Sequence, residues 1–338
     1  MTGRAPGTCK GESSLIQVNH LTKLYGNRVA VDDVSFTAES GRIYGLLGPN
    51  GAGKSTILNM ITGTLGCTEG EILIDGTDIV TNPLSAKRHI GYLPEVPPLY
   101  PEMKVSEYLT FVAEMKQIPA RERAAAVGAV MEKTGLTEVS GRLTGLLSKG
   151  YRQRCGIAQA ILASPDIIVL DEPTDGLDPA QIAEIRGLIR ELGKVRTVIL
   201  SSHIISEVRA VCDRIMILSC GRLIACDTPS GLASLCGGGR SLHLKAAWDI
   251  DGVKALLARV PAACEISCSQ DPDGIVSAVL SDYDTEPDLE SISRAFVEAG
   301  HPLRELRQET PDLEEVYLEL IRNDGYGDGD VPGEESDI

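Results

Sequence analysis

A glycine-rich segment, Gly48 to Thr56, constrains the fold of this chain more than any other stretch. It reads Gly-Pro-Asn-Gly-Ala-Gly-Lys-Ser-Thr, the pattern of a phosphate-binding loop. A buried strand is expected before it, at 42–47, and a helix after it, from Ile57 to Ile61. Glycines let the backbone N–H groups curl round a phosphate, and the helix N-terminus adds partial positive charge. The alternative is a glycine turn that binds no ligand. In chains of this length, the full pattern would arise by chance in about one of a hundred.

The loop therefore predicts a nucleotide site that takes ATP and Mg²⁺. Lys54 is expected to reach the β- and γ-phosphates, and the Ser55 hydroxyl to hold Mg²⁺. The predicted nucleotide-binding residues of the loop are Gly48, Pro49, Asn50, Gly51, Ala52, Gly53, Lys54, Ser55 and Thr56.

Length and composition narrow the class of protein. The chain has 338 residues, enough for two domains, and its 43% of hydrophobic residues is ordinary for a globular protein. Its apolar runs have the length of strands, and no signal peptide is apparent, which predicts a soluble protein in the cytoplasm. The net charge of −16 argues against a nucleic-acid partner. Nine scattered cysteines are expected to be reduced thiols.

Alternating strand and helix patterns predict an α/β core with a largely parallel sheet. Short apolar runs at 167–170, 197–201 and 215–218 are the later strands of this core. Apolar residues at helical spacing after Val105, with Ser106 as a possible N-cap, predict an inserted helical subdomain at about 95–160. The expected limits are a disordered leader (1–14), a nucleotide-binding domain (15–235), an α+β domain (240–322) and an acidic disordered tail (323–338).

The α+β domain is expected to have the element order of a ferredoxin-like fold. The predicted elements are a strand (241–246), a helix (249–260), two strands (263–269 and 274–281), a helix (286–299), a strand (303–308) and a helix (312–322).

Two carboxylates follow the apolar strand at 167–170. Ligands of parallel sheets bind at the carboxyl edge of the strands, where Asp171 and Glu172 emerge. Asp171 is expected to orient Mg²⁺ through water, and Glu172 to polarise the water that attacks the γ-phosphate. His203 follows another apolar strand, and its imidazole is expected to form a hydrogen bond with the γ-phosphate or with that water. The alternative is that His203 only stabilises the fold, as a lone histidine more often does.

A second anion site is indicated at the start of another helix. Ser148 and Gly150 lie in the segment Leu-Ser-Lys-Gly-Tyr, just before an apolar helical stretch. Since the chain already has a loop for its own phosphates, the simplest explanation is that Ser148 and Gly150 contact ATP held by another copy.

With these motifs together, the chain resembles the ATP-binding subunits of ABC transporters. It carries Walker A (48–55), the signature (147–151), Walker B (167–172), the Asp-loop at 176–178 and the switch histidine His203, in the family's order. The resemblance covers residues 16 to about 235 and implies a P-loop NTPase core that forms a head-to-tail dimer round two ATP molecules. It also implies that Tyr25 stacks on adenine, as an aromatic face can.

The motifs depart from the common family pattern in two places. Lys149 and Tyr151 replace a glycine and a glutamine of the signature Leu-Ser-Gly-Gly-Gln. Glu95 stands where the family has a glutamine; a carboxylate can bind Mg²⁺ but adds negative charge beside the triphosphate, and Glu95 is assigned to the metal site together with Ser55 and Asp171.

The segments 90–100, 147–151 and 310–318 resemble ATPases of the ABC-2 class, which includes drug-resistance, sodium-extrusion and gliding-motility exporters. The resemblance implies an ATPase that drives a separate integral membrane permease from the cytoplasmic face of the cell membrane, as a homodimer or heterodimer. The alternative is a soluble ABC ATPase that regulates a partner without transport. Members of the family that act in DNA repair carry a long coiled coil, and none is visible in this sequence. Members that act in translation carry two cores in one chain, whereas this chain shows one. A kinase or GTPase would leave 147–151 and His203 unexplained.

Overall fold

The computed structural model describes residues 14–233, 241–258, 265–281, 288–309 and 313–323. The chain divides into two compact units, Met1–Thr228 and Pro229–Ile338, where the sequence had suggested a limit near 235. The predicted leader and acidic tail, with Cys9, Cys236 and Cys264, lie outside the described residues apart from Ser14 and Asn323. The six described cysteines are free thiols.

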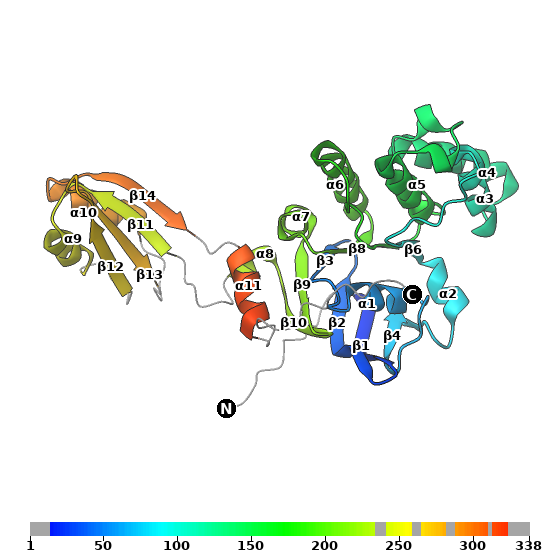
Figure 1. The fold of residues 1–338 in the computed structure, drawn as a ribbon, viewed down its shortest axis with the longest axis horizontal. Helices are drawn as coiled ribbons and strands as arrows, with labels where there is room; N and C mark the ends of the chain where they lie inside the picture. Colours follow the sequence, from blue (N-terminus) through cyan, green and yellow to red (C-terminus); the bar gives the residue numbers. More distant parts are fainter. Residues whose placement is uncertain (1–13, 234–240, 259–264, 282–287, 310–312, 324–338) are drawn as a thin grey trace, which may run out of the picture. The chain divides into compact units, whose positions relative to one another are not determined.

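The first unit holds ten strands and most of the helices of the described chain (Figure 1). Its strands are β1 (Ser14–Tyr25), β2 (Arg28–Glu39), β3 (Ile43–Leu47), β4 (Glu69–Ile74), β5 (Thr77–Asp78), β6 (Ile90–Leu93), β7 (Ile167–Leu170), β8 (Thr197–Ser202), β9 (Arg214–Ser219) and β10 (Arg222–Asp227). Its α-helices are α1 (Lys54–Ile61), α2 (Pro83–Arg88), α3 (Val105–Met115), α4 (Ala120–Lys133), α5 (Lys149–Ile161), α6 (Pro179–Gly193) and α7 (Ile205–Val211), with short 3-10 turns at Thr137–Val139 and Thr144–Leu146.

A six-stranded sheet in the order β10-β9-β3-β8-β7-β6 forms the centre of this unit. All neighbours are parallel except β10, which pairs antiparallel with β9. Every residue of β3, β7 and β8 is buried, as expected for parallel strands covered on both faces. Helix α7 approaches β3 so closely that a Cβ on Gly45 would lie 2.3 Å from a methyl of Val208, which explains the glycine in this strand.

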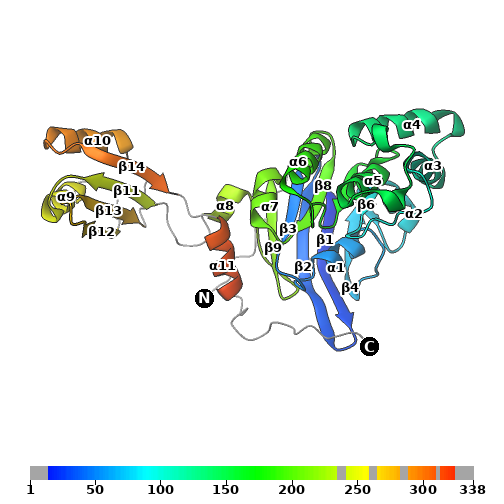
Figure 2. The same ribbon diagram turned by 45° about the horizontal axis from the view of Figure 1, so that its top comes forward.

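A second, antiparallel sheet in the order β2-β1-β4-β5 shares one core with the first (Figure 2). Helix α1 supplies Ile57, Leu58 and Ile61 to this core, together with Ile16 of β1 and Leu46 of β3. Strands β1 and β2 each have 12 residues, and their pairing continues through several irregularities, with positive φ angles at His20 and Asp33.

Helices α3, α4 and α5 pack round a separate cluster that includes Val105, Leu109 and Leu136. Helix α3 begins at Val105, and Lys104 is its N-cap residue, whose N–H donates to the Glu107 carboxylate at 3.0 Å. The prediction of Ser106 as N-cap is therefore wrong; its N–H instead donates to the carbonyl oxygen of Ser140. A backbone contact of this range is not visible in local sequence.

The second unit contains a β-α-β-β-α-β run, as the sequence predicted. Its elements are α8 (Pro229–Ala233), β11 (Ser241–Ala246), α9 (Ile250–Leu257), β12 (Glu265–Gln270), β13 (Val276–Ser281), α10 (Leu289–Glu298), β14 (Leu303–Glu309) and α11 (Leu313–Asn323). The antiparallel sheet has the order β12-β13-β11-β14, and α9 and α10 pack with it through Val253, Leu257, Ile292 and Phe296. This is a ferredoxin-like arrangement.

Candidate functional site

The three strands that carry the predicted chemistry are adjacent in the central sheet. Strand β8 lies between β3, which leads into the glycine-rich loop, and β7, which leads into Asp171 and Glu172. Since these strands are parallel, their carboxyl ends meet at one edge, and His203 follows β8 at that same edge. The sheet order therefore brings together motifs that are far apart in the sequence.

The glycine-rich loop is shaped by glycines that no other residue replaces easily. Gly51 and Gly53 have positive φ angles of 81° and 99°. A Cβ on Gly53 would lie 2.7 Å from the carbonyl oxygen of Ala30, and one on Gly48 would lie 2.6 Å from that of Leu218. The loop spans Gly48 to Gly53, including Pro49, Asn50 and Ala52, and Lys54, Ser55 and Thr56 form the first turn of α1. N–H groups of that turn have no acceptor within the helix and suit an anion.

Lys54 is nearly fully buried beside the loop. Its ammonium group donates to the carbonyl oxygens of Gly48 at 2.8 Å and Pro49 at 3.2 Å, and lies 3.6 Å from Oε1 of Glu172. Burial lowers the pKa of Lys54, while the negative charge of Glu172 opposes that shift. The cation is thus held inside the loop, where a phosphate would meet it.

The oxygens of Ser55 and Asp171 meet directly. The Ser55 hydroxyl donates to Oδ1 of Asp171 at 3.1 Å, and Ser201 of β8 donates to the same oxygen at 2.6 Å. Asp171 is only 2% exposed. Two hard oxygen ligands so close together fit Mg²⁺, which typically takes one or two protein oxygens and completes its shell with water and substrate phosphate. Among the residues that the structure describes, no group of three or more His, Cys, Asp or Glu residues forms a denser metal site.

Glu172 has an unusual backbone conformation. Its φ angle is 46°, which costs a non-glycine residue about 1–3 kcal/mol and must be imposed by the surroundings. Its N–H donates to the Ser201 hydroxyl at 2.8 Å, and its carbonyl oxygen accepts from Gln153 of α5 at 3.4 Å. Its carboxylate is within 3.1 Å of Nδ1 of His203. Backbone strain at a buried carboxylate beside a histidine is typical of a functional site.

Two other predicted residues, Ser148 and Gly150, lie at the start of α5 and have no described hydrogen bond or ion pair with the loop. Ser148 is the exposed N-cap residue, and it accepts from the N–H of Tyr151 at 3.4 Å. Gly150 is buried, and a Cβ there would lie 2.5 Å from the side-chain oxygen of Gln181 in α6. The exposed hydroxyl is available to a ligand that comes from outside this chain.

Tyr25 ends β1 and is 51% exposed, with the Lys23 ammonium 5.4 Å from the centre of its ring. An exposed aromatic ring at this position can stack on a base.

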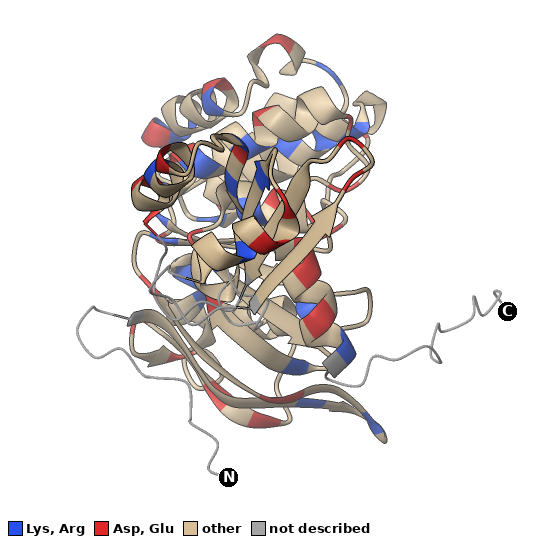
Figure 3. Ribbon diagram, turned by 90° about the vertical axis from the view of Figure 1, so that its left-hand side faces the viewer, with Lys and Arg blue, Asp and Glu red and all other residues tan. Residues whose placement is uncertain are grey.

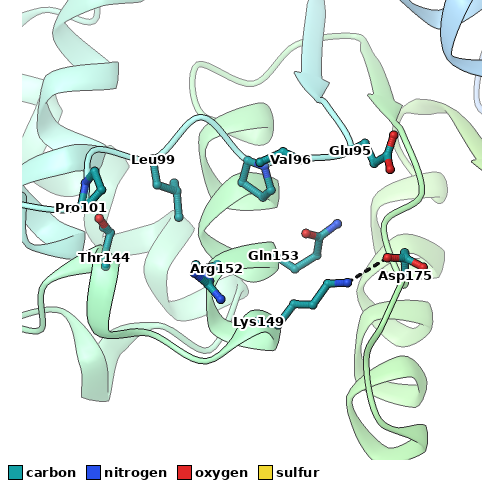
Figure 4. A pocket seen from close by; sticks show the side chains of 11 residues that line it. Glu95, Val96, Leu99, Pro101, Thr144, Lys149, Arg152, Gln153 and Asp175 are labelled. Atoms are coloured by element: carbon teal, nitrogen blue, oxygen red, sulfur yellow. Dashed lines mark hydrogen bonds and ion pairs between the residues drawn. The ribbon is translucent and has the colours of Figure 1, made fainter. Parts of the chain in front are cut away.

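Glu95 lies just after β6, at the rim of a pocket between that segment and α5 (Figure 4). Its charge raises the pKa of Lys54, although burial and the nearer Glu172 have larger effects on that group. The side chain is exposed, and no described hydrogen bond joins it to Ser55 or Asp171. Lys149 reaches across the same pocket and forms an ion pair with Asp175 at 2.8 Å (Figure 4).

Sequence reasoning assigned no role to Ser201, Gln153 or Glu207, all of which are buried at this edge. Ser201 bridges the backbone of Glu172 and the carboxylate of Asp171. Only the position of Ser201 two residues before His203, on a strand next to the Asp171 strand, could have indicated it.

Comparison with known proteins agrees with this geometry. The family model described as ABC transporter matches residues 31–175. The linearmycin resistance ATP-binding protein LnrL of Bacillus subtilis is 31% identical over 308 residues, 90% of this chain and 98% of LnrL. The bacitracin transport ATP-binding protein BcrA of Bacillus licheniformis is 40% identical over 214 residues, 63% of this chain and 69% of BcrA.

A solved structure is similar as well. The dimeric post-hydrolysis state of the ATP-binding cassette MJ0796, bound to ADP and Pi, matches with a TM-score of 0.59 and 27% identity, over 63% of this chain and 98% of that one. The loop geometry, the sheet order and these similarities together show that the chain is an ATP-binding ATPase and belongs to the family of ABC transporter ATP-binding proteins.

Proposed function

We propose that two copies of this subunit, or this subunit and a related one, close head to tail on two Mg-ATP and thereby drive a separate membrane permease. The observation that carries the proposal is that the residues proposed to contact phosphate lie in two separate places. Lys54, Ser55, Asp171, Glu172 and His203 converge on one edge of the sheet, whereas the exposed Ser148 at the start of α5 has no part in that cluster.

In this proposal the loop and Lys54 bind the triphosphate of the chain's own ATP. Ser55 and Asp171 hold Mg²⁺, which would supply positive charge to the β- and γ-phosphate oxygens. Glu95 is a further candidate for this site. Tyr25 stacks on the adenine, and Ser148 and Gly150 of the second copy contact the γ-phosphate from the other side.

Glu172 and His203 are the proposed catalytic residues. The Glu172 carboxylate accepts a proton from the attacking water as general base. The His203 imidazole, 3.1 Å from Glu172, orients that carboxylate and contacts the γ-phosphate. Cleavage removes the group that both copies share, so the two subunits separate. The open and closed states of the dimer differ in shape. A partner that binds one state more tightly than the other therefore changes conformation as ATP is bound and hydrolysed.

The proposed partner is an integral membrane permease, which places this subunit at the cytoplasmic face of the membrane. Within the described residues, no helix combines the length and apolar character needed to cross a bilayer. The pocket beside Glu95 offers an apolar wall, Val96, Pro97 and Leu99, opposite the charged Lys149 and Arg152, and suits an amphipathic helix of the permease. The names of LnrL and BcrA refer to linearmycin resistance and bacitracin transport, which supports export as the direction.

In the view of Figure 3, Lys and Arg residues are interspersed with Asp and Glu residues along the described ribbon. The net charge of −16 also disfavours nucleic acid as the partner.

The test is purification of the tagged full chain from native membranes under mild detergent. The proposal expects an integral membrane protein to co-purify in a fixed ratio and to stimulate ATP hydrolysis. Recovery of the ATPase with no membrane protein, from membranes in which it is active, would overturn the transport proposal. The ATPase assignment would stand.

A further inference from the structure

A buried carboxylate on α7, Glu207, takes no part in the roles assigned above. Its side chain is only 6% exposed, although it lies four residues after His203. Glutamates are rarely buried this far unless they are paired and hydrogen-bonded. Its partners therefore indicate what the burial achieves.

Both hydroxyl partners of Glu207 lie next to a proposed catalytic residue. Oε2 of Glu207 accepts from Oγ1 of Thr174 and, at 3.3 Å, from Oγ of Ser202. Thr174 comes two residues after Glu172, and Ser202 directly precedes His203. One carboxylate oxygen thus ties the segment after β7 to the end of β8.

The other oxygen faces a cation. Nη2 of Arg186 in α6 lies 3.9 Å from Oε1 of Glu207, while Nε of Arg186 is buried without a hydrogen-bond partner. The Ser202 hydroxyl also accepts from the N–H of Ile204 at 3.0 Å, so the backbone on both sides of His203 is fixed. The cluster consists of four side chains from four segments: Glu207 of α7, Thr174 after β7, Ser202 of β8 and Arg186 of α6.

We propose that Glu207 is a positioning residue for ATP hydrolysis: it holds the two segments at the spacing that keeps the carboxylate of Glu172 and the imidazole of His203 in contact, without touching nucleotide. The proposal rests on the catalytic roles given to those two residues above. Glu172 needs such support because its φ of 46° is unfavourable for a glutamate.

The test measures kcat and ATP affinity separately on the full chain. Glu207→Ala is expected to lower kcat about 10- to 100-fold, as small misplacements of catalytic groups do, and to leave the Kd of a fluorescent ATP analogue within about twofold. Glu207→Gln retains an oxygen for both hydroxyls and should restore kcat to within a few-fold of the wild type. The matched control is Glu191→Ala on the exposed surface of α6, which should change neither quantity.

A coupling measurement separates positioning from general stability. When Glu172→Gln has already removed the base, adding Glu207→Ala should lower kcat no further, since residues that act as a unit are not additive. Additive losses, or equal losses of kcat and ATP affinity, would mean a structural role and overturn the proposal. So would an unchanged kcat in Glu207→Ala.

Two outcomes identify which idea has failed. If Glu172→Gln itself turns over normally, the site assignment fails; if it is inactive while Glu207→Ala is fully active, only the role of Glu207 fails. Should Glu207→Ala not fold, Thr174→Val removes a single donor and should still lower kcat several-fold at unchanged ATP affinity. An unchanged kcat in that variant counts against the proposal.

Discussion

Replacing Glu172 by glutamine should stop ATP turnover while ATP binding persists. General bases contribute about 10²- to 10⁴-fold, so the barrier to hydrolysis should rise by about 3–5 kcal/mol. Glutamine keeps the shape of the side chain and a possible hydrogen bond to His203, 3.1 Å away, but it does not accept the proton. The variant therefore tests the base and leaves the packing of the site intact.

The structure also predicts how nucleotide affinity responds. Lys54 is only 6% exposed and loses its carboxylate neighbour at 3.6 Å in this variant, so the nucleotide-free protein should be less stable. The phosphates of ATP replace the lost negative charge, and the repulsion between Glu172 and the triphosphate is gone. We therefore expect the ATP Kd to stay the same or to fall.

Phosphate release at saturating Mg-ATP measures turnover, and binding of a fluorescent ATP analogue measures affinity. Glu191→Gln, the same change on an exposed carboxylate, is the control and should behave as wild type. Turnover within threefold of the wild type in Glu172→Gln would refute the assignment of the base.

Three further predictions concern the loop and the helical subdomain. Lys54→Ala should weaken ATP binding itself by at least tenfold, because it removes the buried cation; tight binding in that variant would argue against the placement of the phosphates. Gly53→Ala places a Cβ 2.7 Å from the carbonyl oxygen of Ala30 at a φ of 99° and should abolish ATP binding, whereas the Cβ of Gly51→Ala meets nothing within 4 Å and should weaken binding less. Equal losses of ATP affinity in the two variants would contradict the argument from close approach. Burial lowers the pKa of Lys116 to about 8, below its value in the unfolded chain, so this group raises the free energy of unfolding as the pH increases from about 8 to 10. Urea titrations at pH 7 and pH 9.5 should show that the stability of Lys116→Met relative to wild type decreases with pH; a difference independent of pH would contradict this.

The sequence predicted the elements that are encoded locally. The phosphate loop and the buried strand at 167–170 are recognisable because glycine spacing and uninterrupted apolar runs have few alternative explanations. The element order of the second unit was also predicted, since alternating strands and amphipathic helices repeat there at regular intervals. The sheet order β12-β13-β11-β14 completes the ferredoxin-like fold.

Features that depend on distant partners were not predicted. Ser201 and Glu207 are an ordinary serine and an ordinary glutamate in sequence. Their long-range partners, Asp171 for Ser201 and Thr174 for Glu207, lie at or after the end of β7, which pairs with β8. Ser106 was misjudged for the same reason, because the start of α3 is fixed by Ser140 and Arg142, which accept from the N–H groups of Ser106 and Val105. Strand β10 was missed since its residues are mostly half-exposed and lack a clear alternation.

The most direct test of the account is the ATPase rate per protomer as a function of protein concentration. If each triphosphate needs donors from two copies, the rate per protomer should rise with concentration, reach a plateau as the dimer forms, and be lost when Ser148 is replaced by arginine. A constant rate per protomer down to concentrations at which the protein is monomeric, with the Ser148→Arg variant fully active, would contradict the shared site.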